Sequence, residues 1–244
     1  MKESKLSSSG LGTLYLIPTT LGQQDYGWVL PSQVIETVHR LHFFVVENEK
    51  SARHFLASIK HPTPIRELNF ELLDEHTQTN QLTQLITPLL HGDSVALISE
   101  AGCPAIADPG ANLVELAQSK GIKIKPLVGP SSIVMSLMAS GLNGQQFAFY
   151  GYLPVEKQQR IMKIQALEAE SRLKNQTQIF IETPYRNEHL FQDLISHCAN
   201  NTRICIAKNI SLADESIMTK SAHEWRKTDI PDLHKQPTIF LILA

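Results

Sequence analysis

The residues best suited to chemistry lie in one short loop, residues 99–110. This loop follows a run that predicts a buried strand, and in an open α/β sheet ligands bind where strands reach their carboxyl ends. Glu100 and Asp108 supply two carboxylates beside Gly102, whose missing side chain lets a ligand approach the backbone. The pattern therefore predicts a ligand-binding loop. The alternative is a well-capped turn, in which Asp108 caps the following helix and Pro109 is its first residue.

Three carboxylates are candidates for the group that accepts a proton from the substrate. They are Glu100, Asp108 and also Glu47, which ends an earlier predicted strand and equally suits a helix cap or a solvated position. Arg186 begins a predicted helix, where it suits either a bidentate contact with a phosphate or a pair with a nearby carboxylate. The ten histidines lack the spacing of metal ligands, so we expect them on the surface.

Composition limits the classes of partner. The formal net charge of the 244 residues is −2, so no global basic field attracts nucleic acid and any RNA contact requires a local cluster. Lys50, Arg53 and Lys60 share a predicted helix, on which such residues ordinarily form a solvated face. The candidates for the RNA-contacting cluster are Lys50, Arg53, Lys60, Arg160 and Arg186.

Cysteine usage and hydropathy favour a cytoplasmic protein. The three cysteines show no CxxC spacing, so we expect neither a disulfide framework nor a metal site. The first ten residues are polar and lack the apolar core of a signal peptide. No apolar run approaches the roughly 20 residues of a membrane-spanning helix, so we expect no membrane partner.

Hydrophobic periodicity predicts an α/β fold in two halves, 1–126 and 127–244, whose join lies within residues 126–144. Strand-like runs alternate with helical patterns in the first domain, which predicts a mainly parallel sheet with helices on its faces. The second domain is predicted to hold a mixed sheet. The expected strands are 13–17, 42–47, 94–98, 122–128, 147–152, 178–182, 203–207 and 238–243. The expected helices are 33–41, 51–59, 79–90, 111–120, a helix that opens at 129–132 and ends at 140–141, 156–173 and 186–198.

A dinucleotide-binding site is not indicated. The first strand is followed by Pro-Thr-Thr-Leu-Gly (18–22), which is not the GxGxxG pattern, and there is no Walker A lysine motif. A loop with proline and one glycine suits a ligand held by shape, backbone carbonyls and apolar walls.

A series of motifs occurs in a familiar order: Leu-Tyr-Leu-Ile-Pro (14–18), the 99–110 loop, Gly-Pro-Ser-Ser (129–132), Ser-Gly-Leu (140–142), Phe-Tyr-Gly-Tyr-Leu-Pro (149–154) and Glu-Thr-Pro-Tyr-Arg (182–186). Together they resemble the tetrapyrrole methylase superfamily of S-adenosylmethionine (SAM) dependent methyltransferases. They are most similar to the branch that methylates a cytidine ribose 2′-hydroxyl in small-subunit ribosomal RNA, of which this chain resembles a diverged paralogue. The resemblance implies two α/β domains, SAM in the cleft between them, and a homodimer.

The resemblance also implies which residues contact SAM. Backbone groups of the 99–110 loop are expected at its methionine end, and Ser132 and Ile133 offer N–H donors at a helix start. Two strand ends of the second domain are expected to line the adenine. The implied cofactor-binding residues are Pro18, Gly102, Cys103, Ile106, Ala107, Ser132, Ile133, Glu182, Thr183, Pro237 and Thr238.

The loops expected to contact substrate depart from the ribosomal branch. That branch usually carries Pro-x-Gly-Asn, Glu-Asp-Thr-Arg and Arg-Glu-Leu-Thr-Lys, where this chain has Pro-Thr-Thr-Leu-Gly (18–22), Glu-Asn-Glu-Lys (47–50) and Lys-Asn-Ile-Ser-Leu (208–212). The sequence therefore supports methyl transfer from SAM more strongly than the rRNA acceptor. Two alternatives remain: methylation of a tetrapyrrole or other small molecule, and a non-catalytic SAM-binding protein.

Overall fold

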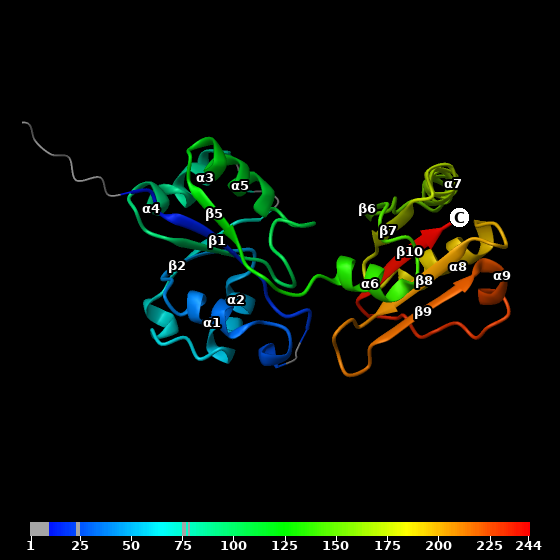
Figure 1. The fold of residues 1–244 in the computed structure, drawn as a ribbon, viewed down its shortest axis with the longest axis horizontal. Helices are drawn as coiled ribbons and strands as arrows, with labels where there is room; N and C mark the ends of the chain where they lie inside the picture. The colour runs from blue at the N-terminus through cyan, green and yellow to red at the C-terminus, as the bar shows by residue number, and fades with distance from the viewer. Residues whose placement is uncertain (1–9, 23–24, 75–76, 78) are drawn as a thin grey trace, which may run out of the picture. The chain divides into compact units, whose positions relative to one another are not determined.

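A computed structural model of the chain describes residues 10–22, 25–74, 77 and 79–244. The chain forms two compact units, Met1–Pro130 and Ser131–Ala244, each built on its own five-stranded sheet (Figure 1). The first sheet is entirely parallel and the second is mixed, which confirms the predicted fold class.

The first unit has the strand order β3-β2-β4-β1-β5. Its strands are β1 (Thr13–Ile17), β2 (Phe43–Val46), β3 (Asn69–Leu72), β4 (Val95–Ile98) and β5 (Lys123–Pro126). Its helices are α1 (Ser32–Val38), α2 (Glu49–Ser58), α3 (Thr79–Leu85), α4 (Thr87–Leu90) and α5 (Gly110–Ser119), with short 3₁₀ turns η1 (Tyr26–Trp28) and η2 (Ile65–Glu67).

Helices cover both faces of this sheet because successive strand residues point in opposite directions. In β2, Val46 belongs to a buried cluster with Phe55 and Leu56 of α2. Its neighbour Val45 belongs to another cluster, with Leu85 of α3 and others from α4 and α5. The central strands β2, β4 and β1 are thus nearly continuous apolar runs, as a doubly covered parallel sheet requires.

The carboxyl ends of β1 and β4 lie level with each other at the centre of the sheet. The two strands pair in parallel, with Ile17 opposite Ile98. The chain leaves β1 toward β2 on one side and leaves β4 toward β5 on the other, so their loops diverge here. Such a topological switch point is where open α/β sheets bind ligands.

The second unit has the strand order β6-β7-β10-β8-β9, in which only β6 and β7 pair in parallel. Its strands are β6 (Phe147–Tyr152), β7 (Thr177–Ile181), β8 (Arg203–Lys208), β9 (Ser216–Ser221) and β10 (Thr238–Leu243). Its helices are α6 (Ser132–Ser140), α7 (Lys157–Lys174), α8 (Asn187–His197) and α9 (Ala222–Trp225). Side chains of α7, α8 and α9 share one buried cluster with β7, β8 and β10.

Among the strands and α-helices, β3, β9 and α9 are not predicted, and one predicted helix is divided in two. The edge strands β3 and β9 are not predicted, because neither contains a buried apolar run. The expected helix 79–90 is two helices, since Pro88 in the first turn of α4 has no N–H to continue a longer helix. No helix among the described residues is long and apolar enough to cross a membrane.

Candidate functional site

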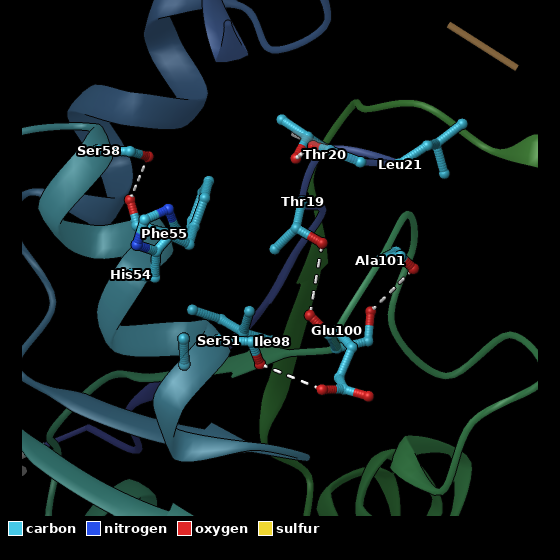
Figure 2. A pocket seen from close by; sticks show the side chains of 13 residues that line it. Thr19, Thr20, Leu21, Ser51, His54, Phe55, Ser58, Ile98, Glu100 and Ala101 are labelled. Atoms are coloured by element: carbon cyan, nitrogen blue, oxygen red, sulfur yellow. Dashed lines mark hydrogen bonds between the residues drawn. The ribbon is translucent and has the colours of Figure 1, made fainter. Parts of the chain in front are cut away.

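A pocket of about 530 Å³ lies at the carboxyl ends of β1 and β4 (Figure 2). All of its lining belongs to the first unit. It is formed by the loop after β1, one face of α2, and the end of β4 with the start of its loop. The lining residues are Thr19, Thr20, Leu21, Gly22, Ser51, Ala52, His54, Phe55, Ser58, Ile98, Ser99, Glu100 and Ala101.

Hydrogen bonds hold the two loops of this pocket together. The Thr19 amide donates to the Gly102 carbonyl at 2.9 Å, and the Thr19 hydroxyl donates to the Ser99 carbonyl at 3.4 Å. Thr19 and Ser99 are both buried. The walls of the pocket are therefore fixed relative to the sheet before any ligand binds.

The 99–110 loop follows an unusual backbone path. Gly102, Ala105 and Ala107 all have positive φ angles, of 71°, 65° and 61°. A left-handed conformation is unfavourable for alanine, so other contacts must hold the loop in place. Asp108 does so, because its Oδ1 accepts hydrogen bonds from the Ala105 amide at 2.7 Å and the Gly110 amide at 3.0 Å.

This geometry gives Asp108 an organising position in the loop. Burial raises the pKa of its carboxyl above the ordinary range, against the opposing effect of hydrogen bonds from Gly110, Ala105 and the Ser99 hydroxyl. Its expected helix contact is present, but the boundary differs from the prediction. Pro109 is the N-cap residue and Gly110 the first helical residue, so Pro109 is not in the first helical position.

Side chains of neighbouring loops pack closely against two glycines around the site. A methyl group on Gly102 would lie 3.1 Å from Cδ2 of Leu21 and 3.4 Å from the Pro130 carbonyl oxygen. One on Gly129 would lie only 2.3 Å from Cβ of Pro18. The loops after β1, β4 and β5 thus meet at one edge of the sheet.

Cys103 belongs to this packed edge of the sheet. Its thiol donates to the Pro130 carbonyl at 3.4 Å. Burial raises the pKa of this thiol, which disfavours the reactive thiolate. The Cys103 side chain therefore packs as a small apolar group. Ile106 and Ala107 are exposed on the outer side of the loop.

Of the three candidate carboxylates, Glu100 lines the pocket. Its Oε1 accepts a hydrogen bond from the Ser51 hydroxyl of α2 at 3.4 Å, and its amide donates to Oε2 of Glu47 at 3.5 Å. Glu47 and Asp108 instead line an adjacent cavity of about 10 Å³, room for a single water molecule. The structure thus brings the three together but gives only Glu100 access to the larger pocket.

His54 is a pocket residue that the sequence reasoning missed. It lies on α2 with Ser51, Phe55 and Ser58, at the i, i+3, i+4 and i+7 spacing of one helix face. Three of these four side chains are polar, and this spacing of polar residues along one helix face is a signal that the sequence carries. His54 is exposed and makes no hydrogen bond with another described residue.

The expectation that all histidines lie on the surface is wrong for His61, which is half-buried and contacts the carbonyls of residues 38 and 41.

The basic residues of the expected RNA cluster have different environments. Lys50 and Lys60 are exposed, although Lys60 follows α2 and does not belong to it. Arg53 pairs with Glu49 at 2.5 Å and lies over the Phe70 ring. The prediction for Arg160 is wrong: this side chain is buried and donates to Asp193 at 2.8 and 2.7 Å.

In the second unit, several expected SAM contacts lie at one end of the sheet. Glu182 directly follows β7, and Thr238 begins β10 on the antiparallel neighbour strand. The Glu182 side chain is fully buried; its Oε1 accepts from Arg186 at 2.6 Å and from the Thr183 amide at 2.6 Å. Arg186 is therefore paired with a carboxylate. Oε2 of Glu182 has no hydrogen-bond donor among the described residues.

The remaining expected contacts are at the start of α6 and at Pro237. Ser131 is the N-cap of α6, with its hydroxyl accepting from the Val134 amide at 3.5 Å. The amides of Ser132 and Ile133 belong to the first turn, where the helix itself provides no acceptor. Pro237 is exposed beside buried Thr238.

Comparisons with known proteins agree with this architecture. The sequence profile of the family described as Tetrapyrrole (Corrin/Porphyrin) Methylases matches residues 14–224. Ribosomal RNA small subunit methyltransferase I of Vibrio cholerae is 30% identical over 217 residues, covering 89% of this chain and 71% of that protein. Its namesake from Halalkalibacterium halodurans is 31% identical over 213 residues, covering 87% and 69%.

Among solved structures, the methyltransferase CobJ shares the fold with a TM-score of 0.62. The two are 14% identical, and the alignment covers 96% of this chain and 94% of that one. Together with the profile match, this shows that the chain belongs to the tetrapyrrole methylase family of SAM-dependent methyltransferases.

Proposed function

We propose that this chain transfers the methyl group of SAM to the ribose 2′-hydroxyl of a cytidine in small-subunit ribosomal RNA. Support comes first from relatives about 30% identical that are named ribosomal RNA small subunit methyltransferase I. The observation that favours this acceptor over a tetrapyrrole is the chemistry of the pocket lining.

Among the described residues, the pocket lining offers no permanently charged cation to neutralise an anion. Its lining contains hydroxyl groups, one imidazole and one carboxylate, but no lysine or arginine. Biosynthetic tetrapyrroles carry several carboxylates, which need cationic partners when they leave water. The base and ribose of an RNA nucleotide are uncharged and present hydroxyl and amino groups, and the negative charge lies on the phosphates that flank them. The Glu100 carboxylate and the pocket hydroxyls suit such a ligand, and they disfavour a polyanionic macrocycle.

The expected SAM-binding residues fit the chemistry of that molecule. SAM carries a carboxylate, an ammonium group and an adenine, so its site needs donors, acceptors and an apolar slot. In the first unit, Pro18, Gly102, Cys103, Ile106 and Ala107 would supply backbone groups and apolar surface. In the second unit, the amides of Ser132 and Ile133 would donate, and Thr183, Pro237 and Thr238 would lie beside the adenine. The buried Oε2 of Glu182, which lacks a donor, would accept from an amino group.

In the proposed reaction the protein aligns the acceptor hydroxyl and removes its proton. SAM, when bound, supplies an electrophilic methyl group and a neutral thioether leaving group. Fixing a nucleophile in line accounts for much of the catalysis in such a displacement. Glu100 and His54 line the pocket and are able to accept the hydroxyl proton. The general base is identified by comparing the pH–rate profiles of Glu100→Gln and His54→Gln with that of the wild type. Only the variant that lacks the base should lose the inflection that the wild-type profile shows.

The acceptor class is tested by supplying tritiated SAM together with different substrates. We expect methyl incorporation into small ribosomal subunits from cells lacking this gene and none into a polycarboxylate tetrapyrrole. Incorporation into the tetrapyrrole alone would move the assignment to small-molecule chemistry. Binding of SAM without transfer to either acceptor would identify a non-catalytic SAM-binding protein.

We further propose that the chain acts as a homodimer in the cytoplasm, where ribosomal subunits are found. The family resemblance supports a dimer, and Val134 and Met138 expose apolar side chains on α6. Sedimentation equilibrium should give twice the monomer mass of 27.3 kDa. A monomer mass at micromolar concentration would contradict the dimer.

A further inference from the structure

The most exposed aromatic side chain described in the first unit is Trp28, at 89% of its full accessible area. Tryptophan is normally among the largely buried residues of a folded protein. Trp28 lies in the 3₁₀ turn η1, in the connection between β1 and α1. Neither the core nor the pocket described above accounts for an indole in this position.

The turn that carries Trp28 is firmly held. The Asp25 carboxylate accepts from the Gly27 amide at 2.9 Å, and its carbonyl accepts from the Trp28 amide at 3.2 Å. The Leu30 amide donates to the Tyr26 carbonyl at 2.8 Å. Tyr26 packs against the core cluster that contains buried Leu30. The backbone beneath the indole is therefore ordered before any partner binds, which lowers the entropy lost on binding.

The anchor of this turn lies at the edge of the sheet where the pocket is found. A methyl group on Gly129 would lie 3.3 Å from Cδ2 of Leu30 and 2.3 Å from Cβ of Pro18. Leu30 thus packs beside Pro18, which immediately precedes the pocket-lining Thr19. Trp28 is two residues from this anchor and is consequently presented near the carboxyl edge of β1.

We propose that Trp28 is a stacking platform for an unpaired RNA base next to the nucleotide that is methylated. This inference rests on the proposed rRNA function. Specific contacts with RNA bases are made mostly in unpaired segments, where bases stack on aromatic rings without needing charge. That mode of binding suits a chain whose net charge is −2 and whose Arg53, Arg160 and Arg186 are already paired with carboxylates.

The surroundings of the indole favour a nucleobase over a second protein. Its exposed neighbours Asp25 and Gly27 present no apolar side chain, and its apolar neighbours Tyr26 and Val29 are half-buried against the core. A protein interface normally requires a contiguous apolar patch, whereas a base needs only one accessible ring face. The ring is thus suited to a planar, stacking partner.

The test measures binding of a fluorescein-labelled oligocytidylate by anisotropy. Trp28→Ala should weaken binding about 5- to 150-fold, the range expected for losing one base–aromatic stack. Trp28→Phe should retain most of the affinity because it keeps a ring. Leu173→Ala is the matched control: Leu173 is 84% exposed on α7 of the second unit, and its loss should leave binding unchanged. The salt dependence should be the same in all variants, since no phosphate contact is removed.

Intrinsic fluorescence provides a second measurement. The chain has two tryptophans, and Trp225 is 3% exposed in the core of the second unit. Quenching on addition of the unlabelled oligonucleotide should therefore come from Trp28 and disappear in Trp28→Phe.

Two results would overturn the inference. One is equal RNA affinity of wild type and Trp28→Ala, which leaves the proposed rRNA function intact. The other is a change of sedimentation in Trp28→Ala without a change of RNA affinity, which would assign the indole to an interface between copies. A wild-type chain that fails to methylate small ribosomal subunits would instead contradict the proposed function itself.

Discussion

At the scale of single residues, the 99–110 loop shows both what the sequence reveals and what it hides. Its glycine and paired carboxylates predict a ligand-binding loop from residue type alone, and the structure places Glu100 in a pocket. The left-handed Ala105 and Ala107 are not predictable, because alanine has no preference for that conformation. His54 is also missed, since its position depends on how α2 packs beside two loops far away in the sequence.

Gly102 should be required for SAM binding. The Cβ of valine at this position would lie tightly against the Leu21 side chain, and the residue would be strained at a φ of 71°. We expect Gly102→Val to abolish SAM binding measured by calorimetry while leaving the circular dichroism spectrum largely unchanged. The matched control is Gly121→Val, which has a similar φ of 68° but nothing within 4 Å. Normal SAM binding by Gly102→Val would show that this loop is not the cofactor site.

Asp108→Asn tests the organising position of that carboxylate through pH. Burial raises the pKa of Asp108, so the folded protein holds this proton more tightly than the unfolded chain does. At neutral pH the buried, charged carboxylate therefore lowers the free energy of unfolding. As the pH falls from the raised pKa of the folded protein to the ordinary pKa of the unfolded chain, the carboxylate is protonated and this loss of stability disappears. In urea unfolding, the stability of Asp108→Asn relative to wild type should be greater at pH 7 than in mild acid. A difference that grows as the pH is lowered would contradict this assignment.

At the scale of elements, the sequence predicts every central strand and the edge strands β5 and β6, but it misses the edge strands β3 and β9. The strands β4 and β10 are continuous apolar runs that are buried along their whole length. By contrast, β3 and β9 are edge strands, which bury few side chains and need only one hydrogen-bonded neighbour. Edge strands acquire their conformation from pairing with β2 and β8, so local periodicity carries little information about them.

Arg160 joins two helices through a buried ion pair, a role that hydrophobic periodicity does not show. Its guanidinium on α7 and the Asp193 carboxylate on α8 are 6% and 7% exposed and join the two helices. We expect Arg160→Met to destabilise the second unit by about 3–5 kcal/mol, because it leaves a buried carboxylate unpaired. Denaturant unfolding followed by Trp225 fluorescence in a Trp28→Phe background reports this unit.

The double variant Arg160→Met/Asp193→Leu is the control for this pair. It removes both charges, so it should recover most of the lost stability. Unaltered stability of the single variant would show that the pair does not support the packing of α7 against α8.

At the scale of the whole molecule, the near-neutral charge decides how RNA is attracted. Three of the five candidate basic residues are paired with carboxylates, which leaves Lys50 and Lys60 as the exposed members of the set. We therefore expect a shallow salt dependence of RNA affinity, with Lys50 and Lys60 as its main contributors.

Replacing both lysines tests this expectation. For single-stranded RNA, Lys50→Ala/Lys60→Ala should reduce the log–log salt slope by about 0.7 per lost phosphate contact, or about 1.4 in total. The control is Lys174→Ala in the second unit, a residue paired with Glu170, which should leave the slope unchanged. An unchanged slope in the double variant would place the phosphate contacts elsewhere.

The most direct test of the rRNA assignment is to compare modified nucleosides in living cells. Small-subunit rRNA from cells with and without this gene is digested to nucleosides, and 2′-O-methylcytidine is quantified by mass spectrometry. We predict that deletion lowers 2′-O-methylcytidine, that the wild-type gene restores it, and that the Gly102→Val gene does not. An unchanged level of 2′-O-methylcytidine after deletion would contradict the central claim that this chain methylates a cytidine ribose in ribosomal RNA.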